Sequence, residues 1–222
     1  MINDWKLGMR MLRYAHGIKM NCIAAGLVML LEIPAVILGR MNGNGFPAFY
    51  MLLVAGMLPT QALFSLSVAG MVQASPLKKK LQTKIPALMN FSIMAAIYLT
   101  GGLFCGIMVW GKLENREFIY ENMIILAIAI AAIMVYMGVA YKHFIAASAG
   151  LLPVLCFMMS KGLSGKGLPN VLSGRGTPFW QVLLGGFAIL AAGAMAEYLL
   201  SLLVYRAPMD KMAQSAPLRK EI

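Results

Sequence analysis

Long stretches without a charged side chain are the feature that most limits how this chain folds. Six apolar stretches follow one another, separated by short basic or Gly-rich segments. About 20 apolar residues are enough for a helix to cross the hydrocarbon core of a bilayer. The composition agrees, because 60% of the residues are apolar and only 12% are charged. We therefore expect an all-α integral membrane protein with one membrane domain over residues 1–222.

The flanking charges and turn residues set the limits of the spans. We expect six transmembrane helices at residues 20–39, 47–73, 86–111, 123–141, 144–160 and 179–205. The fourth and fifth are joined by a very tight turn at Lys142 and His143. Residues 161–178 form a Gly/Ser/Pro-rich loop, for which a re-entrant hairpin is one interpretation, and residues 206–222 form a basic tail.

The N-terminal segment, residues 1–19, is expected to be an amphipathic helix in the inner headgroup region. Lys6, Arg10 and Arg13 recur at helical spacing, and Trp5, Met9 and Leu12 occupy the neighbouring face. This pattern is typical of an interfacial helix. Asn3 or Asp4 is suited to cap its start. The alternative is a basic tail without regular structure.

The distribution of basic residues predicts the orientation of the spans. With six spans both termini lie on one side, and 13 of the 19 Lys and Arg residues then fall on that side. Short segments rich in Lys and Arg stay in the cytoplasm. We therefore expect an N-in, C-in protein of the plasma membrane of a bacterial cell. The formal net charge of +11 thus reflects membrane topology, and no nucleic-acid partner is expected.

The segment between the second and third spans carries the densest charge, with four lysines within seven residues: Lys78, Lys79, Lys80 and Lys84. Ser75 and Pro76 read as the N-cap and first residue of a short helix, and Pro86 as the residue that ends it. A short cationic helix on the cytoplasmic face is suited to bind a soluble partner. The alternative is a topology signal with no further role.

Two carboxylates lie inside expected spans, Glu32 in the first and Glu197 in the sixth. A charge at that depth costs on the order of 2–3 kcal/mol or more, so both side chains should face the bundle interior or a wet cavity. They either line a translocation path or hold a structural hydrogen bond, and the sequence leaves both open.

Several motif matches carry no function. Gly162-Leu163-Ser164-Gly165 matches the GxSG of rhomboid proteases, but the two histidines, His16 and His143, are expected at the opposite side of the membrane. The repeated LSGKG and LSGRG resemble the ABC signature, yet the chain has no Walker A motif. The three cysteines lack metal or disulfide spacing, and the 20 methionines are mostly scattered. No catalytic, cofactor-binding or metal-binding residue is therefore expected.

The order of these features resembles the ABC-2 type exporter permeases, in the short six-span form found in Firmicutes-like bacteria. The resemblance in sequence is specific only around residues 68–86. Within this region residues 68–83 read VAGMVQASPLKKKLQT and look like the SSP-x-KK-x-L stretch of those permeases. The resemblance implies a like or unlike dimer of permease subunits and a separate ABC ATPase that binds ATP and Mg²⁺. It also implies a coupling helix to that ATPase, formed by Ser75, Pro76, Leu77, Lys78, Lys79, Lys80, Leu81, Gln82 and Lys84. We expect Leu77 and Leu81, at i and i+4, to fill a groove in the ATPase.

The function that follows is a permease subunit for an amphipathic or hydrophobic substrate such as a peptide. The chain itself is then not an enzyme, and its other partner is membrane lipid. Two alternatives belong to other classes. One is a proton-coupled secondary transporter that uses Glu32 or Glu197. The other is a membrane scaffold or sensor subunit that transports nothing.

Overall fold

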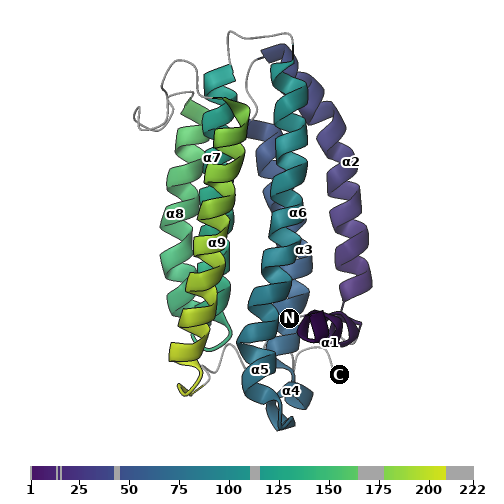
Figure 1. The fold of residues 1–222 in the computed structure, drawn as a ribbon, viewed down its shortest axis with the longest axis vertical. Coiled ribbons are helices and arrows are strands. Elements are labelled where there is room, and N and C mark those ends of the chain that lie inside the picture. Colours follow the sequence, from purple (N-terminus) through teal and green to yellow (C-terminus); the bar gives the residue numbers. More distant parts are fainter. Residues whose placement is uncertain are drawn as a thin grey trace.

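The structure is a bundle of long helices that stand side by side, with short helices gathered at one end (Figure 1). The computed structural model describes residues 2–13, 15, 17–42, 46–110, 116–164 and 178–208. Within these ranges the helices are α1 (Ile2–Leu12), α2 (Ile18–Asn42), α3 (Phe46–Val68), α4 (Gly70–Ala74), α5 (Lys78–Gln82), α6 (Lys84–Val109), α7 (Arg116–Ala140), α8 (Phe144–Ser164) and α9 (Phe179–Val204). The described part of the chain has no strand, which confirms the all-α prediction.

Five of these helices are long and apolar enough to cross a membrane: α2, α3, the helical segment that includes α6, α7, and α9. α8 has 21 residues, but its described apolar stretch, Phe144–Phe157, is shorter. Large apolar side chains point outward along the long helices, such as Leu30 on α2 (63% exposed) and Leu203 on α9 (77%). Such a surface suits hydrocarbon and not water. The chain therefore has the helices of a multi-pass membrane protein.

The long helices form two groups with α6 between them (Figure 1). α2 packs on α3, and α7 packs on both α8 and α9, while α6 contacts members of each group. The main core fills the space between them with side chains such as Leu52, Met94, Tyr98, Ile130 and Leu190. A second, smaller core lies at the end with the short helices, around Leu63, Val72, Leu81, Ile85 and Met89.

α9 lies very close to α6 and α7 because glycines remove the side chains between them. A Cβ added to Gly138 would lie 2.8 Å from the Glu197 carbonyl oxygen, and one added to Gly193 would lie 2.9 Å from the Ala131 Cα. Small residues allow such approach between membrane helices. On α6, Gly102 and Gly106 form a GxxxG pair; Gly102 is buried, but Gly106 faces open space.

The helix limits differ from the sequence-based limits mainly near polar turns. The helix expected over residues 1–19 is α1, which ends at Leu12, and Gly17, with φ of 73°, precedes α2. The expected span 47–73 is two helices, because α3 ends at Val68 and α4 begins at Gly70. α7 begins at Arg116, so it includes Glu117 and Glu121, which the sequence places in a loop. An acidic residue is favourable in the first turn of a helix.

The tight turn between the expected fourth and fifth spans is confirmed. α7 ends at Ala140, α8 begins at Phe144, and the amide of His143 donates to the Val139 carbonyl at 3.0 Å. Most of the expected loop 161–178 and the tail beyond Pro208 lie outside the described residues.

Candidate functional site

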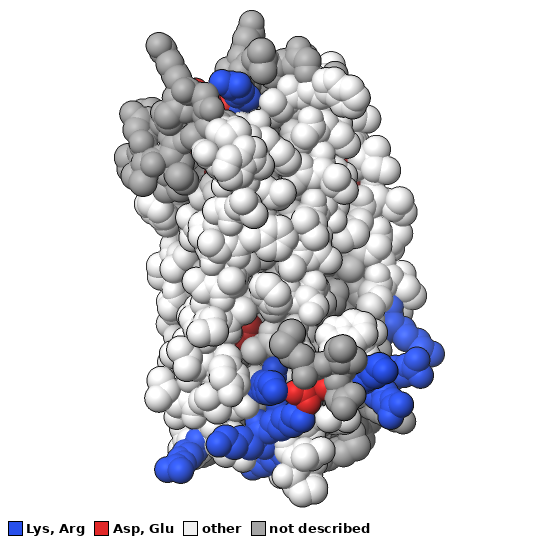
Figure 2. Space-filling model, viewed as in Figure 1, with Lys and Arg blue, Asp and Glu red and all other residues white. Residues whose placement is uncertain are grey.

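Lys and Arg side chains gather at the end of the molecule that carries α1, α4 and α5 (Figure 2). We call residues 69–84 the lysine hinge; they connect α3 to α6 and contain α4 and α5. Four lysines close together are costly in hydrocarbon, so the chain is expected to leave the membrane at this segment. This segment contains every residue that the sequence assigns to the coupling helix.

The turn at Ser75 corrects one prediction. Ser75 is not the N-cap of the short helix: α5 begins at Lys78, its N-cap position is Leu77, and no side chain caps it. Instead the Leu77 amide donates to the Ser75 hydroxyl at 3.1 Å, a serine turn that precedes the helix. Pro86 does not end the helix either, because α6 already begins at Lys84. Proline is tolerated there since the first turn has unpaired amides anyway.

The two hinge leucines point in different directions, which corrects a second prediction. Leu77 is 48% exposed, whereas Leu81 is 7% exposed and packs in the smaller core beside Val72 and Ile85. Leu81 therefore faces the protein and is not available to a partner. The exposed residues of the lysine hinge include Leu77, Lys79 and Lys84.

Gln82 connects the lysine hinge to the end of α3. Its side chain is 1% exposed, and its Nε2 donates to the Ser67 carbonyl oxygen at 3.0 Å. Because α3 ends at Val68, this carbonyl lacks its usual helical partner. After α5, the Thr83 hydroxyl donates to the Lys79 carbonyl at 2.7 Å. A specific hydrogen bond thus attaches α5 to the end of α3, and the Thr83 bond closes the last turn of α5 where the chain continues into α6.

Asp4 attaches α1 to the lysine hinge. Its carboxylate accepts from Lys80, and its second oxygen lies 2.8 Å from the Lys84 ammonium. Hydrogen bonds from these two lysines lower the pKa of Asp4 to about 2, so the carboxylate is charged at any cellular pH. Asp4 lies within α1 and is not its N-cap. Nearby, Gly8 lets α1 approach Met89 on α6, because a Cβ there would lie 2.8 Å from the Met89 sulfur.

α1 presents an apolar face to the protein and another to its surroundings. Leu7, Met11 and Leu12 pack against the smaller core, whereas Trp5 (44% exposed) and Met9 (42%) point away from it. Figure 1 shows α1 lying across the bundle axis. This is the arrangement expected of an interfacial helix.

The turn after α7 adds a buried lysine to the same end of the molecule. Lys142 is 5% exposed. Its burial lowers the pKa of the ammonium, and the positive charge of Lys78 lowers that pKa further. Lys142 therefore lies beneath the cationic end of the molecule and adds little to its exposed charge.

Glu197 lies in a buried polar cluster between α6 and α9. It is 2% exposed, and its Oε2 accepts a hydrogen bond from Asn90 Nδ2 at 3.0 Å. The neighbouring Tyr141 hydroxyl donates to the Ser201 carbonyl at 2.8 Å, which joins α9 to the turn after α7. The cavity beside these residues measures about 10 Å³, room for about one water. In this conformation the geometry gives Glu197 a structural hydrogen bond and no wet path.

Glu32 is fully buried on the face of α2 that packs against α3, the same face as Val36. Neither of its carboxyl oxygens has a hydrogen-bond partner among the described residues. Glu32 does not line the cavity beside Glu197. Glu32 lies 14 residues from Ile18, the first residue of α2, and Glu197 lies seven residues from Val204, the last residue of α9. Both of these helix ends are at the end of the bundle with the short helices (Figure 1), so the distances of the two carboxylates from that end differ by roughly 10 Å. The structure therefore does not bring the two carboxylates together.

Sequence reasoning did not identify the partners of Asp4 and Glu197. Asp4 is the only acidic residue before Glu32 and stands out in a basic segment, but its partners lie on other helices, Lys80 on α5 and Lys84 on α6, so local spacing does not identify them. Asn90 gives no such signal, because one amide within an apolar run has no periodicity. No group of three or more His, Cys, Asp or Glu that can hold a metal occurs within the described ranges.

Comparison of the chain with models of protein families, with curated proteins and with solved structures gave no match.

Proposed function

We propose that the chain is the transmembrane subunit of an ATP-driven exporter of amphipathic or hydrophobic substrates. The observation that supports this most is the lysine hinge. It consists of the uncharged helix α4 and the cationic helix α5, has an exposed leucine between them, and is held to α1, α3 and α6. A segment that serves only to orient the chain needs charge but no fixed shape. In this protein three features fix the shape of the lysine hinge: the interruptions between its helices, the buried side chain of Gln82 and the ion pairs of Asp4.

In this proposal the end with the lysine hinge faces the cytoplasm, α8 also crosses the membrane as the fifth of six spans, and both ends of the chain are cytoplasmic. α8 lies beside α7 and runs back from the turn at Lys142 (Figure 1). Its 21 residues measure about 31 Å along the axis, enough for a hydrocarbon core of about 30 Å. The basic residues at the hinge end follow the positive-inside rule.

ATP and Mg²⁺ bind to a separate ATPase, which contacts the lysine hinge. Displacement of the hinge is transmitted to α6 directly, to α3 through Gln82 and to α1 through Asp4. A second permease subunit, like or unlike, completes the pathway. The tilt of the helix groups about α6 then changes access from one side of the membrane to the other.

The exposed leucine of the lysine hinge provides the test. The chain is co-expressed with an ABC ATPase encoded next to its gene, and co-purification and ATP hydrolysis in nanodiscs are measured. Leu77→Asp places a charge at the centre of the contact, so we expect association to fall tenfold or more, or about 1.4 kcal/mol or more. Because Leu77 is 48% exposed, folding and insertion should not change. Leu81→Asp is unsuitable since it disrupts the smaller core.

Two control variants sharpen this experiment. Lys79→Gln removes one exposed charge of the hinge and should cost about 1 kcal/mol or less. Arg206→Gln removes an exposed charge beyond α9, outside the hinge, and should change nothing. Normal association and ATP hydrolysis in Leu77→Asp would refute the coupling role and leave the scaffold or sensor function as the better account.

A proton-coupled secondary transporter is the second candidate, favoured by the burial of Glu32 without a hydrogen-bond partner among the described residues. An unpaired carboxyl group inside a membrane helix is costly and often functional. In this alternative Glu32 takes up and releases the coupled proton. Proton-driven transport by proteoliposomes without any ATPase, abolished in Glu32→Gln, would favour it over the exporter.

A further inference from the structure

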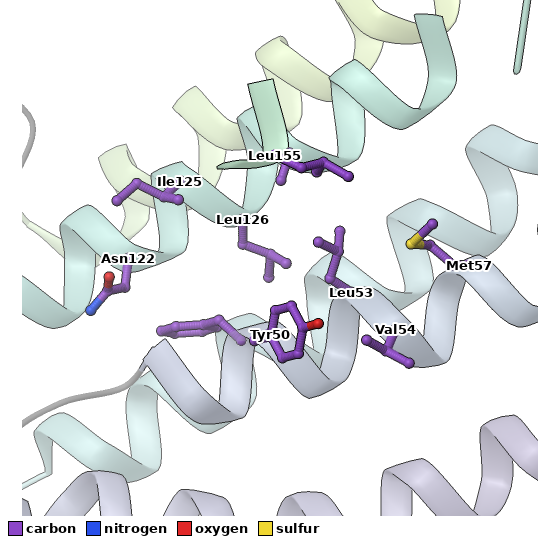
Figure 3. Close-up of a pocket in the computed structure, with 10 residues that line it drawn as sticks. Tyr50, Leu53, Val54, Met57, Asn122, Ile125, Leu126 and Leu155 are labelled. Carbon is purple, nitrogen blue, oxygen red and sulfur yellow. The ribbon is translucent and has the colours of Figure 1, made fainter. Parts of the chain in front are cut away.

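A cavity of about 230 Å³ lies between α3 and α8, with α7 as its floor. Its walls are almost entirely apolar: Leu53 and Met57 come from α3, Leu126 and Ala129 from α7, and Leu155 from α8 (Figure 3). Engineered apolar cavities of about 150 Å³ bind benzene-sized molecules, and drug-sized pockets begin near 300 Å³. This cavity therefore has room for a single alkyl chain or a molecule of similar size.

One polar side chain stands at an end of this cavity. Asn122 lines it, is 1% exposed, and has no hydrogen-bond partner for either Nδ2 or Oδ1 among the described residues. Figure 3 places Asn122 at one end and Met57 at the other, and the Tyr50 hydroxyl points away from Asn122. A buried amide without a partner is costly, so a ligand that satisfies it gains the free energy that the amide lacks in the empty cavity.

The position of the cavity along the bundle sets the polarity of its ligand. Asn122 lies six residues inside α7, about 9 Å from its start, and Ala129 lies about 20 Å from it. Likewise Met57 lies about 17 Å from the start of α3. The polar end is thus near the membrane boundary remote from the lysine hinge, and the apolar end is near the middle of the bundle. This is the orientation of an amphiphile in that leaflet.

We propose that this cavity binds a neutral, single-chain amphiphile whose head group both donates and accepts a hydrogen bond, namely an alcohol or a primary amide. Such a head group satisfies Nδ2 and Oδ1 of Asn122 together. An ester accepts only, and so leaves Oδ1 unpaired. A carboxylate also adds a buried charge, which no residue lining the cavity compensates. The distance from Asn122 to Ala129, about 10 Å, fits a chain of roughly eight carbons with bonds near 1.5 Å.

The test uses a photoactivatable octanol with a diazirine on its chain, added to the full chain in nanodiscs of defined phosphatidylcholine. We expect saturable labelling of residues that line the cavity, such as Met57 and Leu155, located by mass spectrometry. Unlabelled octanol and octanamide should compete. Methyl octanoate, octanoate and octane should compete about tenfold more weakly, because each leaves at least one Asn122 atom unpaired or adds a charge.

Two variants separate the head-group contact from the cavity. Asn122→Leu keeps an apolar cavity, so octanol and octane should compete equally well. Ala129→Phe fills the cavity and should abolish labelling; if that variant does not fold, Val54→Phe fills it from the half-buried opposite wall. Labelling that does not saturate, that persists in the filled variant, or that every competitor reduces equally in the wild type would overturn the proposal. The assay needs no ATPase, so either outcome leaves the exporter proposal to its own test.

Discussion

Asn90 and Glu197 show what one pair of polar side chains does between membrane helices. Asn90 Nδ2 donates to Glu197 Oε2 at 3.0 Å, and both residues are buried. The sequence located Glu197 because a carboxylate stands out in an apolar run, and it predicted correctly that the side chain faces the interior. It did not identify Asn90, because the pairing depends on how α6 packs on α9. Partners 107 residues apart follow from packing and not from local pattern.

Substitution of Glu197 separates a structural hydrogen bond from a translocation path. Glu197→Gln keeps an acceptor for Asn90 Nδ2 and adds a donor for Asn90 Oδ1, which has no partner among the described residues. Its melting temperature in detergent should equal or exceed that of the wild type. Glu197→Leu leaves the Asn90 amide unpaired, so we expect a loss of about 1–3 kcal/mol, nearer the lower value because such bonds are weak in membranes.

Transport measurements complete that comparison. Reconstituted Glu197→Gln should transport at the wild-type rate if the bond is structural. Loss of transport in this variant at unchanged stability would contradict the structural role and return Glu197 to the translocation path.

The lysine hinge is the element in which the structure differs most from the sequence-based prediction. Its position, charge and short helical character were predictable from four lysines between two apolar stretches. The direction in which its side chains point was not predictable. Leu77 and Leu81 have the spacing of one helical face, but Leu81 is buried in the smaller core and α5 has only five residues. Ser75 likewise fits an N-cap but makes a turn. In so short an element, tertiary packing outweighs periodicity.

Asp4 is expected to hold α1 against this element. Spin labels at positions 9 and 77, both exposed in the structure, should give one narrow distance distribution in the wild type. Asp4→Asn removes the charge that Lys80 and Lys84 share, so the distribution should broaden toward longer distances. Lys6→Gln, an exposed change of charge on the same helix, should leave it narrow.

The same labels test how this contact depends on pH. The pKa of Asp4 is lowered from its ordinary value of 3.8 to about 2. A lowered folded-state pKa means that the contact is fully present above about pH 3.8 and is lost as the pH falls toward 2. The distance should therefore be constant between pH 8 and 4. Broadening near pH 6 would show that Asp4 is not the group that holds α1.

At the scale of the molecule, most of the architecture was predictable because membrane spans follow from length and hydropathy. The limits of α6 and α9 agree with the expected spans 86–111 and 179–205 within about two residues. The arrangement of the helices was not predictable: that α6 separates two groups, or that Gly138 and Gly193 bring α7 against α9, depends on side-chain packing. The cavity at Asn122 arises in the same way, from three helices that meet at one point.

The number of crossings is the largest feature still to be measured, and one labelling experiment decides it. In a background without Cys22, Cys105 and Cys156, single cysteines are placed at positions 79, 117 and 206 and labelled from each side of the membrane. If α8 crosses, positions 79 and 206 are labelled from the cytoplasm and position 117 from outside. If α8 does not cross, α9 carries position 206 to the outside, on the side of position 117. The length of α8 and its place beside α7 favour the first result. Labelling of positions 206 and 117 from the same side would leave five spans, and would remove the six-span exporter architecture on which the proposed function depends.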